Sequence, residues 1–165
     1  MRVSQVVSVL AGAAALVTMA AVPATAATSG AAALGKMGVD TAKLAPGWTY
    51  SGDKVSWDNG NTELILSPAS AGDCTNDYVC VWEKDNFTGR RLQFHDAGLR
   101  NLTDYGFNDK ASGWYNRRGV DARWYYDING GGTSRCIQSG ARSAKLGGDN
   151  DKMSSLRIYS SDSAC

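Results

Sequence analysis

A short polar pattern that occurs twice constrains the fold of this chain more than any other feature. The stretch Phe-Asn-Asp-Lys-Ala-Ser-Gly-Trp at 107–114 returns as Asp-Asn-Asp-Lys-Met-Ser-Ser-Leu at 149–156, with Asn, Asp, Lys and Ser each repeated 42 positions on. An aromatic residue, an Asn-containing turn and a glycine seven places later precede each copy, at 82–89 and at 125–132. Such self-similarity indicates two copies of one structural unit.

The composition of these two units predicts β-structure. From Cys74 onward, short runs rich in Val, Trp, Tyr, Phe and Ile alternate with clusters of Gly, Asn and Asp, and no stretch keeps a helical period over three turns. This alternation is typical of short strands joined by tight turns. A unit of about 42 residues has room for four short strands. We therefore predict an all-β sandwich of two Greek-key motifs, at about 74–118 and 119–165.

The chain before Cys74 has a different character. An early arginine, an apolar run and Ala24-Thr25-Ala26 form the pattern of a secretory signal peptide. The following Ala/Gly-rich residues, up to about 46, predict a flexible arm. Asn59-Gly60 lies between two β-prone runs and predicts a hairpin. The predicted organisation is a signal peptide at 1–26, an arm with a hairpin at 27–73, and the β domain at 74–165.

Charge and hydropathy limit the partners and the location of the protein. The chain has 17 basic and 16 acidic residues, and the basic ones are scattered, which argues against a nucleic-acid or anionic-membrane partner. No stretch after Ala26 supplies the roughly 20 apolar residues of a membrane span. We therefore expect a secreted, extracellular monomer.

Four cysteines, an even number in an exported chain, favour two disulfide bonds. Three pairings are possible, of which we expect Cys74–Cys80 together with Cys136–Cys165. The alternative is a zinc site. It fits poorly, because the spacing of the first two cysteines does not match a zinc knuckle and His95 is the single histidine of the chain.

The repeated motifs resemble those of a known superfamily. Aromatic-x4-Phe-x-Gly at 82–89 is similar to the folded hairpin of the βγ-crystallins, and Asn-Asp-x-x-Ser is similar to their calcium-binding stretch. Residues 74–94 and 105–114 resemble exported bacterial proteins that are grouped with the metalloproteinase inhibitors of actinomycetes. The resemblance extends over 74–165. It implies a peptidase inhibitor that binds an extracellular protease through a rigid loop, for which 75–79 and 127–133 are the candidates.

The same resemblance implies up to two Ca²⁺ ions, a cation that takes six to eight oxygen ligands. In the family, a serine hydroxyl and a backbone carbonyl come from one stretch, an acid from the other stretch, and a further carbonyl from the folded hairpin. One carboxylate per site predicts an affinity between about 10⁻⁶ and 10⁻³ M. The expected calcium-site residues are Asn108, Asp109, Lys110, Ser112, Asn150, Asp151, Lys152, Ser154, Glu83 and Tyr126.

The chain departs from the family pattern at three places. Gly113 stands where the calcium-binding stretch has a serine, so we expect the site of this copy to be the weaker one. Gly130 replaces the aromatic residue of the second hairpin, which predicts poorer packing there. The characterised inhibitor of the family also closes its reactive loop with two nearby cysteines late in the domain, and this chain has no such pair.

Other interpretations of the motifs remain open. The two serines can hydrogen-bond across the hairpins and Asn-Asp can form turns with no ion bound. An EF-hand starting at Asp127 is excluded, because Gln138 occupies the position of the bidentate glutamate. The alternative function is a calcium-stabilised structural, stress or antimicrobial binding protein without inhibitory activity.

Nothing in the sequence indicates catalysis. His95 is alone, and the chain contains no G-x-S-x-G or H-E-x-x-H motif and no paired-carboxylate arrangement. Five tryptophans could suggest a sugar-binding platform, but aromatic residues at strand positions usually fill a core. We therefore predict a protein that is not an enzyme and has no catalytic residues.

Overall fold

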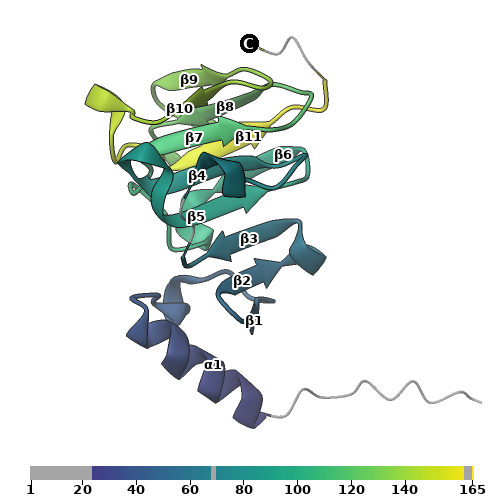
Figure 1. The fold of residues 1–165 in the computed structure, drawn as a ribbon, viewed down its shortest axis with the longest axis vertical. Coiled ribbons are helices and arrows are strands. Elements are labelled where there is room, and N and C mark those ends of the chain that lie inside the picture. Colours follow the sequence, from purple (N-terminus) through teal and green to yellow (C-terminus); the bar gives the residue numbers. More distant parts are fainter. Residues whose placement is uncertain (1–23, 68–69, 162–164) are drawn as a thin grey trace, which may run out of the picture.

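A computed structural model describes residues 24–67, 70–161 and 165, with side chains from residue 30 onward. Within these residues, one α-helix precedes eleven strands (Figure 1). The helix and strands are α1 (Ala24–Lys36), β1 (Thr49–Ser51), β2 (Lys54–Trp57), β3 (Thr62–Ile65), β4 (Val79–Lys84), β5 (Thr88–Phe94), β6 (Gly98–Asn101), β7 (Gly113–Asn116), β8 (Ala122–Tyr125), β9 (Ser134–Ile137), β10 (Arg142–Ser143) and β11 (Ser155–Ile158).

The strands form two antiparallel sheets that exchange strands between the Greek keys. One sheet has the order β1-β2-β3-β5-β4-β7-β10 and the other β6-β11-β8-β9. The third strand of the first key, β6, therefore pairs with β11 of the second key, and the third strand of the second, β10, pairs with β7 of the first. This order confirms the predicted all-β sandwich of two Greek keys.

The core lies between the two sheets, where strand alternation directs the apolar side chains. Val81 and Leu92 from one sheet, and Trp124 and Leu156 from the other, are at most 1% exposed and belong to one cluster. Trp82 on the opposite face of β4 belongs to a smaller cluster around Cys74 and Cys80. The aromatic residues at these strand positions thus pack inside the fold, as the sequence predicts.

The predicted hairpin is confirmed and is continuous with the larger sheet. β2 and β3 are joined through Asp58–Gly60, with Asn59 in the left-handed region at φ 56°. β3 also pairs with β5, so that Leu64 lies opposite Leu92. The hairpin and β1 therefore lengthen the first sheet by three strands at the end nearest α1 (Figure 1).

The prediction of a flexible arm up to residue 46 is wrong for the residues that the structure describes. Leu34 of α1 is fully buried, and Val39 and Leu44 are 4% and 8% exposed within the main core cluster. Ala45 is fixed on both sides, since its N–H donates to Asp104 O at 2.6 Å and its carbonyl accepts from Trp57 Nε1 at 3.0 Å. The prediction failed because it relied on the average Ala/Gly-rich composition of this segment. The segment also contains a few apolar side chains, and these are buried in the core.

Both expected disulfides are present, Cys74–Cys80 and Cys136–Cys165, and this confirms the predicted pairing. Most of the predicted signal peptide, residues 1–23, lies outside the described residues. Within the described part of the chain, no helix combines the length and the apolar character that a membrane span needs.

Candidate functional site

The two repeated polar stretches lie side by side and exchange backbone hydrogen bonds. The N–H of Asp109 donates to Met153 O at 3.0 Å, and the N–H of Asp151 donates to Ala111 O at 3.1 Å. Both aspartates adopt left-handed backbone conformations, with φ of 52° and 56°. The same residue in each copy thus contacts the other copy, which relates the two halves by a pseudo-two-fold axis.

Each repeated serine is buried against the first strand of its own Greek key. Ser112 and Ser154 are 5% and 6% exposed. The N–H of Ser112 donates to Trp82 O at 2.8 Å, and that of Ser154 donates to Tyr125 O at 2.9 Å. Each serine therefore lies close to the next residue along the chain, Glu83 in β4 or Tyr126 directly after β8, whose carbonyl the resemblance assigns to calcium.

The two serine hydroxyls contact different members of the expected ligand sets. Ser112 Oγ donates to Glu83 O at 3.0 Å, within one Greek key. Ser154 Oγ donates to Asp109 Oδ1 at 3.0 Å, across the boundary between the keys. The second contact joins an acid from one stretch to a serine from the other, which is the cross-motif arrangement that the resemblance implies.

The remaining members of the two stretches hold these oxygens in position. The amides of Asn108 and Asn150 donate to the neighbouring carboxylates, at 2.7 Å to Asp109 Oδ2 and 2.8 Å to Asp151 Oδ2. The two lysines also behave alike, since Lys110 Nζ donates to Gly106 O at 2.9 Å and Lys152 Nζ to Gly148 O at 2.7 Å. Each ammonium group is thus bonded to the carbonyl of the glycine that directly precedes its own stretch.

A hollow of about 310 Å³ opens beside Ser112 and is also lined by Glu83 and Asn150. Lys145 and Asp85 line it as well, with Lys145 Nζ 3.8 Å from Asp85 Oδ2. The carboxylate of Glu83 accepts from Arg90 Nε at 2.9 Å, and this hydrogen bond lowers the pKa of Glu83. The carboxylate of Glu83 is therefore occupied by Arg90, and its backbone carbonyl faces Ser112.

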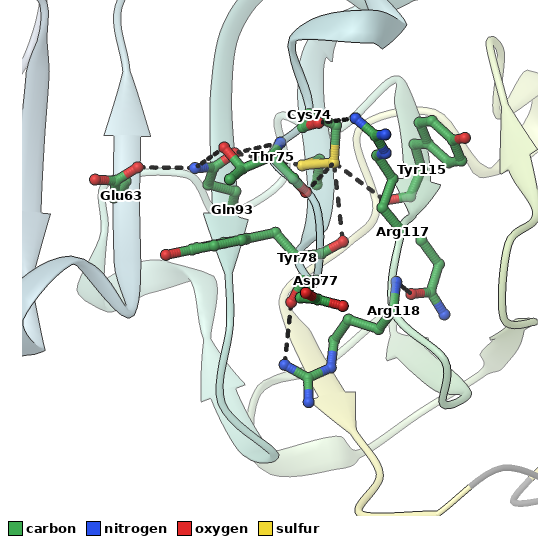
Figure 2. Close-up of a disulfide and its surroundings, with 11 residues drawn as sticks. Glu63, Cys74, Thr75, Asp77, Tyr78, Gln93, Tyr115, Arg117 and Arg118 are labelled. Atoms are coloured by element: carbon green, nitrogen blue, oxygen red, sulfur yellow. Dashed lines mark hydrogen bonds between the residues drawn. A yellow bond between two sulfur atoms is a disulfide. The ribbon is translucent and has the colours of Figure 1, made fainter.

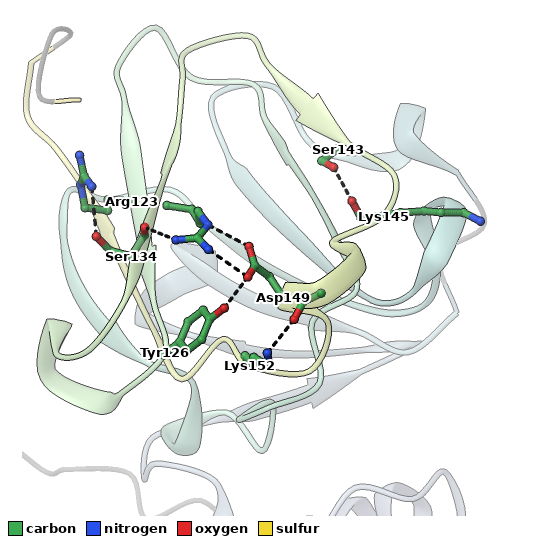
Figure 3. A network of polar contacts seen from close by, with 9 residues as sticks. Arg123, Tyr126, Ser134, Ser143, Lys145, Asp149 and Lys152 are labelled. Atoms are coloured by element: carbon green, nitrogen blue, oxygen red, sulfur yellow. Dashed lines mark hydrogen bonds and ion pairs between the residues drawn. The ribbon is translucent and has the colours of Figure 1, made fainter.

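Asp149, the first residue of the second stretch, belongs to a polar network that sequence reasoning missed (Figure 3). The hydroxyl of Tyr126 donates to Asp149, and Arg135 Nε donates to the same carboxylate at 2.9 Å. The bond from Tyr126 is the first cause that lowers the pKa of Asp149, and it raises the pKa of Tyr126. The repeat could have indicated this difference from the sequence. It aligns the polar Asp149 with Phe107, which is buried in the first copy.

The folded hairpins explain the spacing of the aromatic, asparagine and glycine residues. Asn86 and Asn129 adopt φ of 57° and 58°, and Gly89 and Gly132 adopt φ of 74° and 70°. A Cβ on Gly132 would lie 2.5 Å from Asp127 Oδ2, so the corner closes only around glycine.

The two corners differ where Gly130 replaces an aromatic residue. In the first corner, Phe87 packs edge-on against Trp82 with ring centroids 5.1 Å apart. In the second, the Cα of Gly130 faces Leu99, whose nearest atom would lie 3.7 Å from an added Cβ. In the second corner, Leu99 from a neighbouring strand thus lies where the first corner has its own Phe87.

The first candidate loop, 75–79, is held by the Cys74–Cys80 disulfide and by two arginines (Figure 2). Arg117 Nη1 donates to Cys74 O at 2.6 Å, and Arg118 Nη1 donates to Asp77 O at 3.2 Å. Thr75, Asn76 and Asp77 are exposed at its tip. The loop is therefore rigid and exposed, and its tip is polar.

The second candidate loop, 127–133, is held by side chains from other elements. Ser155 Oγ donates to Asp127 O at 2.6 Å and accepts from the N–H of Gly130 at 3.0 Å. Asn101 Oδ1 accepts from the N–H of Asn129 at 2.7 Å. The loop is thus pinned without a disulfide of its own.

His95 lies outside both stretches. Its Nδ1 is 2.8 Å from Asp96 Oδ1, and both side chains are more than 40% exposed. A surface pair of this kind does not form a catalytic constellation with the other site residues.

Comparison with known proteins gives one family match. Residues 67–137 match the model described as Peptidase inhibitor family I36. This segment includes the first Greek key and both candidate loops. No curated protein matches the chain.

Several solved structures are similar to about half of the chain. A structure of the eye-lens βγ-crystallin domain fold is 18% identical over 58% of this chain and 96% of its own, with a TM-score of 0.48. A βγ-crystallin from Ciona intestinalis is 20% identical over 50% and 99% of the two chains, with a TM-score of 0.45. A βγ-crystallin domain from Flavobacterium johnsoniae is 28% identical over 53% and 97%, with a TM-score of 0.44.

The strand order, rather than these partial similarities, establishes the sandwich of two exchanged Greek keys. The family match agrees with the prediction that the protein is not an enzyme, and with the two disulfides it points to an extracellular protein. Over residues 67–137, somewhat less than half of its length, the chain is therefore similar to peptidase inhibitor family I36.

Proposed function

We propose that the protein is a secreted inhibitor of an extracellular protease, and that Ca²⁺ stabilises its two Greek keys. The observation that carries the calcium proposal is the contact between Ser154 and Asp109 at 3.0 Å, which brings oxygen ligands from the two keys together. The inhibitory part rests on the family match over 67–137. Rigid exposed loops suit such a role, because a preorganised loop loses little conformational freedom on binding.

Oxygen-rich surroundings make both half-sites suitable for a hard cation. The first ion would be held by Ser112 Oγ with the carbonyls of Glu83 and Lys110 and the carboxylate of Asp151. The second would be held by the matching set of Ser154, Tyr126, Lys152 and Asp109. Asn108 and Asn150 would orient the carboxylates, since their amides already donate to them. An ion bound in this way would link the two keys by charge and add to the stability of the fold.

The calcium proposal is tested by thermal unfolding in EDTA and in millimolar CaCl₂. A site with a dissociation constant near 10 μM would add about 2.7 kcal/mol to the free energy of unfolding at about 1 mM Ca²⁺. Asp109→Asn combined with Asp151→Asn should abolish the shift in melting temperature, whereas Asp127→Asn, outside both ligand sets, should retain it. An equal calcium shift in the double variant would contradict the proposed ligands.

The inhibitory proposal is tested by titrating thermolysin-like and subtilisin-like proteases with the purified protein. Residual activity should fall to near zero at a stoichiometric ratio, and the inhibitor should remain intact on a gel. Full protease activity at equimolar protein, across the panel, would instead support the alternative of a calcium-stabilised structural or antimicrobial binding protein.

A further inference from the structure

The surface of the inhibitor-family segment carries one conspicuous apolar side chain. Ile128 is 48% exposed, and among the described residues only Met37 is also a large exposed hydrophobic, at 40%. Met37 follows α1 and lies outside the matched segment 67–137, whereas Ile128 lies within it. The two candidate loops differ in the same respect, because Thr75, Asn76 and Asp77 at the other tip are all polar.

The fold does not require an apolar residue at this corner. The internal repeat provides the comparison, since Asp85 occupies the equivalent position of the first folded hairpin and approaches Lys145 at 3.8 Å. Both corners have the same backbone, with Asn86 and Asn129 in the left-handed region at 57° and 58°. A polar residue is therefore compatible with this backbone conformation, and folding of the corner does not explain why position 128 is isoleucine.

The surroundings leave the Ile128 side chain accessible to a partner. Gly130, Gly131 and Gly132 follow it after one residue and carry no side chains that could cover it. The corner is nevertheless rigid, because Ser155 and Asn101 bind its backbone, and Gly131 closes the turn by donating to Ile128 O at 3.2 Å. Its neighbours Asp127 and Asn129 are exposed and polar. A rigid apolar anchor within a polar rim is the usual composition of an interaction hot spot.

We propose that Ile128 is the anchor residue of the inhibitor, and that it inserts into the apolar specificity pocket of the target protease. The inference rests on the proposed inhibitory function and names the residue that performs it. The target is accordingly a protease that prefers large aliphatic side chains. Ser155 and Asn101 act as positioning residues, which hold the corner that presents Ile128.

The inference is tested by measuring the inhibition constant of Ile128→Ala and Ile128→Asp against the proteases that the wild type inhibits. Loss of a buried aliphatic side chain should raise the inhibition constant roughly 10- to 100-fold for Ile128→Ala. Ile128→Asp should weaken inhibition further, because a carboxylate would have to enter an apolar pocket. The melting temperature of both variants should stay near that of the wild type, since the side chain is largely exposed.

Met37→Asp serves as the control, because it alters the other exposed apolar side chain, outside both candidate loops, and it should inhibit like the wild type. Asn76→Ala tests the competing loop 75–79 and should leave the inhibition constant unchanged if Ile128 is the anchor. Wild-type-like inhibition by Ile128→Asp, or a large loss with Asn76→Ala alone, would overturn the inference while the inhibitory function stands. A wild-type protein that inhibits no protease in the panel would instead overturn the proposed function, and the inference with it.

Discussion

At the scale of single residues, the two copies of the repeat use different atoms to close the same corner. In the second key, the hydroxyl of Ser155 bridges Asp127 O and the N–H of Gly130. Asn101 Oδ1 also accepts from the N–H of Asn129 in this key, at 2.7 Å. In the first key, the N–H of Asn86, the counterpart of Asn129, donates to Ala144 O at 2.9 Å. The backbone next to β10 thus takes the place of the asparagine side chain. The same backbone lies close to Gly113, which stands where the second key has Ser155.

Gly113→Ser should destabilise the protein, although the family pattern has serine at this position. An added Cβ would lie 3.0 Å from Ser143 O and 3.4 Å from Ala144 O, and backbone cannot yield as a side chain does. We expect a loss of about 1–3 kcal/mol in the free energy of unfolding, the usual range for overpacking. Urea denaturation measures this loss. An unchanged or raised stability would show that β10 can move away.

Ionisation of Glu83 should make stability depend on acid pH. The hydrogen bond from Arg90 lowers the pKa of Glu83 in the folded protein, so folding favours the carboxylate. Its contribution is present above the ordinary pKa of a glutamate, about 4.3, and is lost as the pH falls through the lower folded value. The melting temperature of Glu83→Gln should accordingly fall less than that of the wild type between about pH 6 and 3.

Asp85→Asn provides the control for this experiment, because it changes an adjacent carboxylate that lies 3.8 Å from Lys145. It should retain the acid sensitivity of the wild type. Equal acid sensitivity in Glu83→Gln would assign the effect to other carboxylates. Neither substitution removes the backbone carbonyl of Glu83.

At the scale of elements, pairing between distant strands joins parts that the sequence separates. β6 and β10 each complete the sheet of the other Greek key, so neither key has a whole sheet by itself. β3 pairs with β5 and brings the preceding residues onto the same sheet. α1 then packs through Leu34, which joins the main core cluster. The N-terminal segment thus contributes to the core of the protein.

Leu34→Ala should therefore cost about 2–5 kcal/mol of unfolding free energy, as expected for truncation of a fully buried leucine. Met37→Ala, one residue beyond α1 and 40% exposed, should change stability little. Chemical denaturation of the two variants makes the comparison. Equal stability of Leu34→Ala and the wild type would show that this segment does not contribute to the core and behaves as an independent arm.

At the scale of the whole molecule, the two disulfides close loops of very different length. Cys74–Cys80 closes the loop that leads into β4, with a sequence separation of 6. Cys136–Cys165 joins β9 to the chain beyond β11 across a separation of 29. Asp121 supports the second connection, since its Oδ2 accepts from the N–H of Cys165 and its Oδ1 from that of Ser139.

Removal of each disulfide by paired Cys→Ala substitution should reflect these loop lengths. In the chain-entropy model, loss of Cys136–Cys165 costs about 3.6 kcal/mol and loss of Cys74–Cys80 about 2.2 kcal/mol. Equilibrium unfolding in urea under oxidising conditions measures both. A greater loss for the shorter loop would indicate that native contacts around Cys74, such as the bond from Arg117, outweigh chain entropy.

The sequence by itself determined the fold class, the duplication and the hairpin around Asn59, because turn chemistry and strand alternation are local properties. The ten candidate calcium-site residues came from the resemblance of the repeated motifs to the βγ-crystallins. Only the tertiary structure decided which strands each key exchanges, and hence why Gly113 is a glycine and how Asp109 reaches Ser154. It also decided that Leu34 is buried and that Asp149 binds Tyr126. These features depend on contacts between residues that lie far apart in the chain. A periodic pattern within one segment does not indicate which other segment will pack against it.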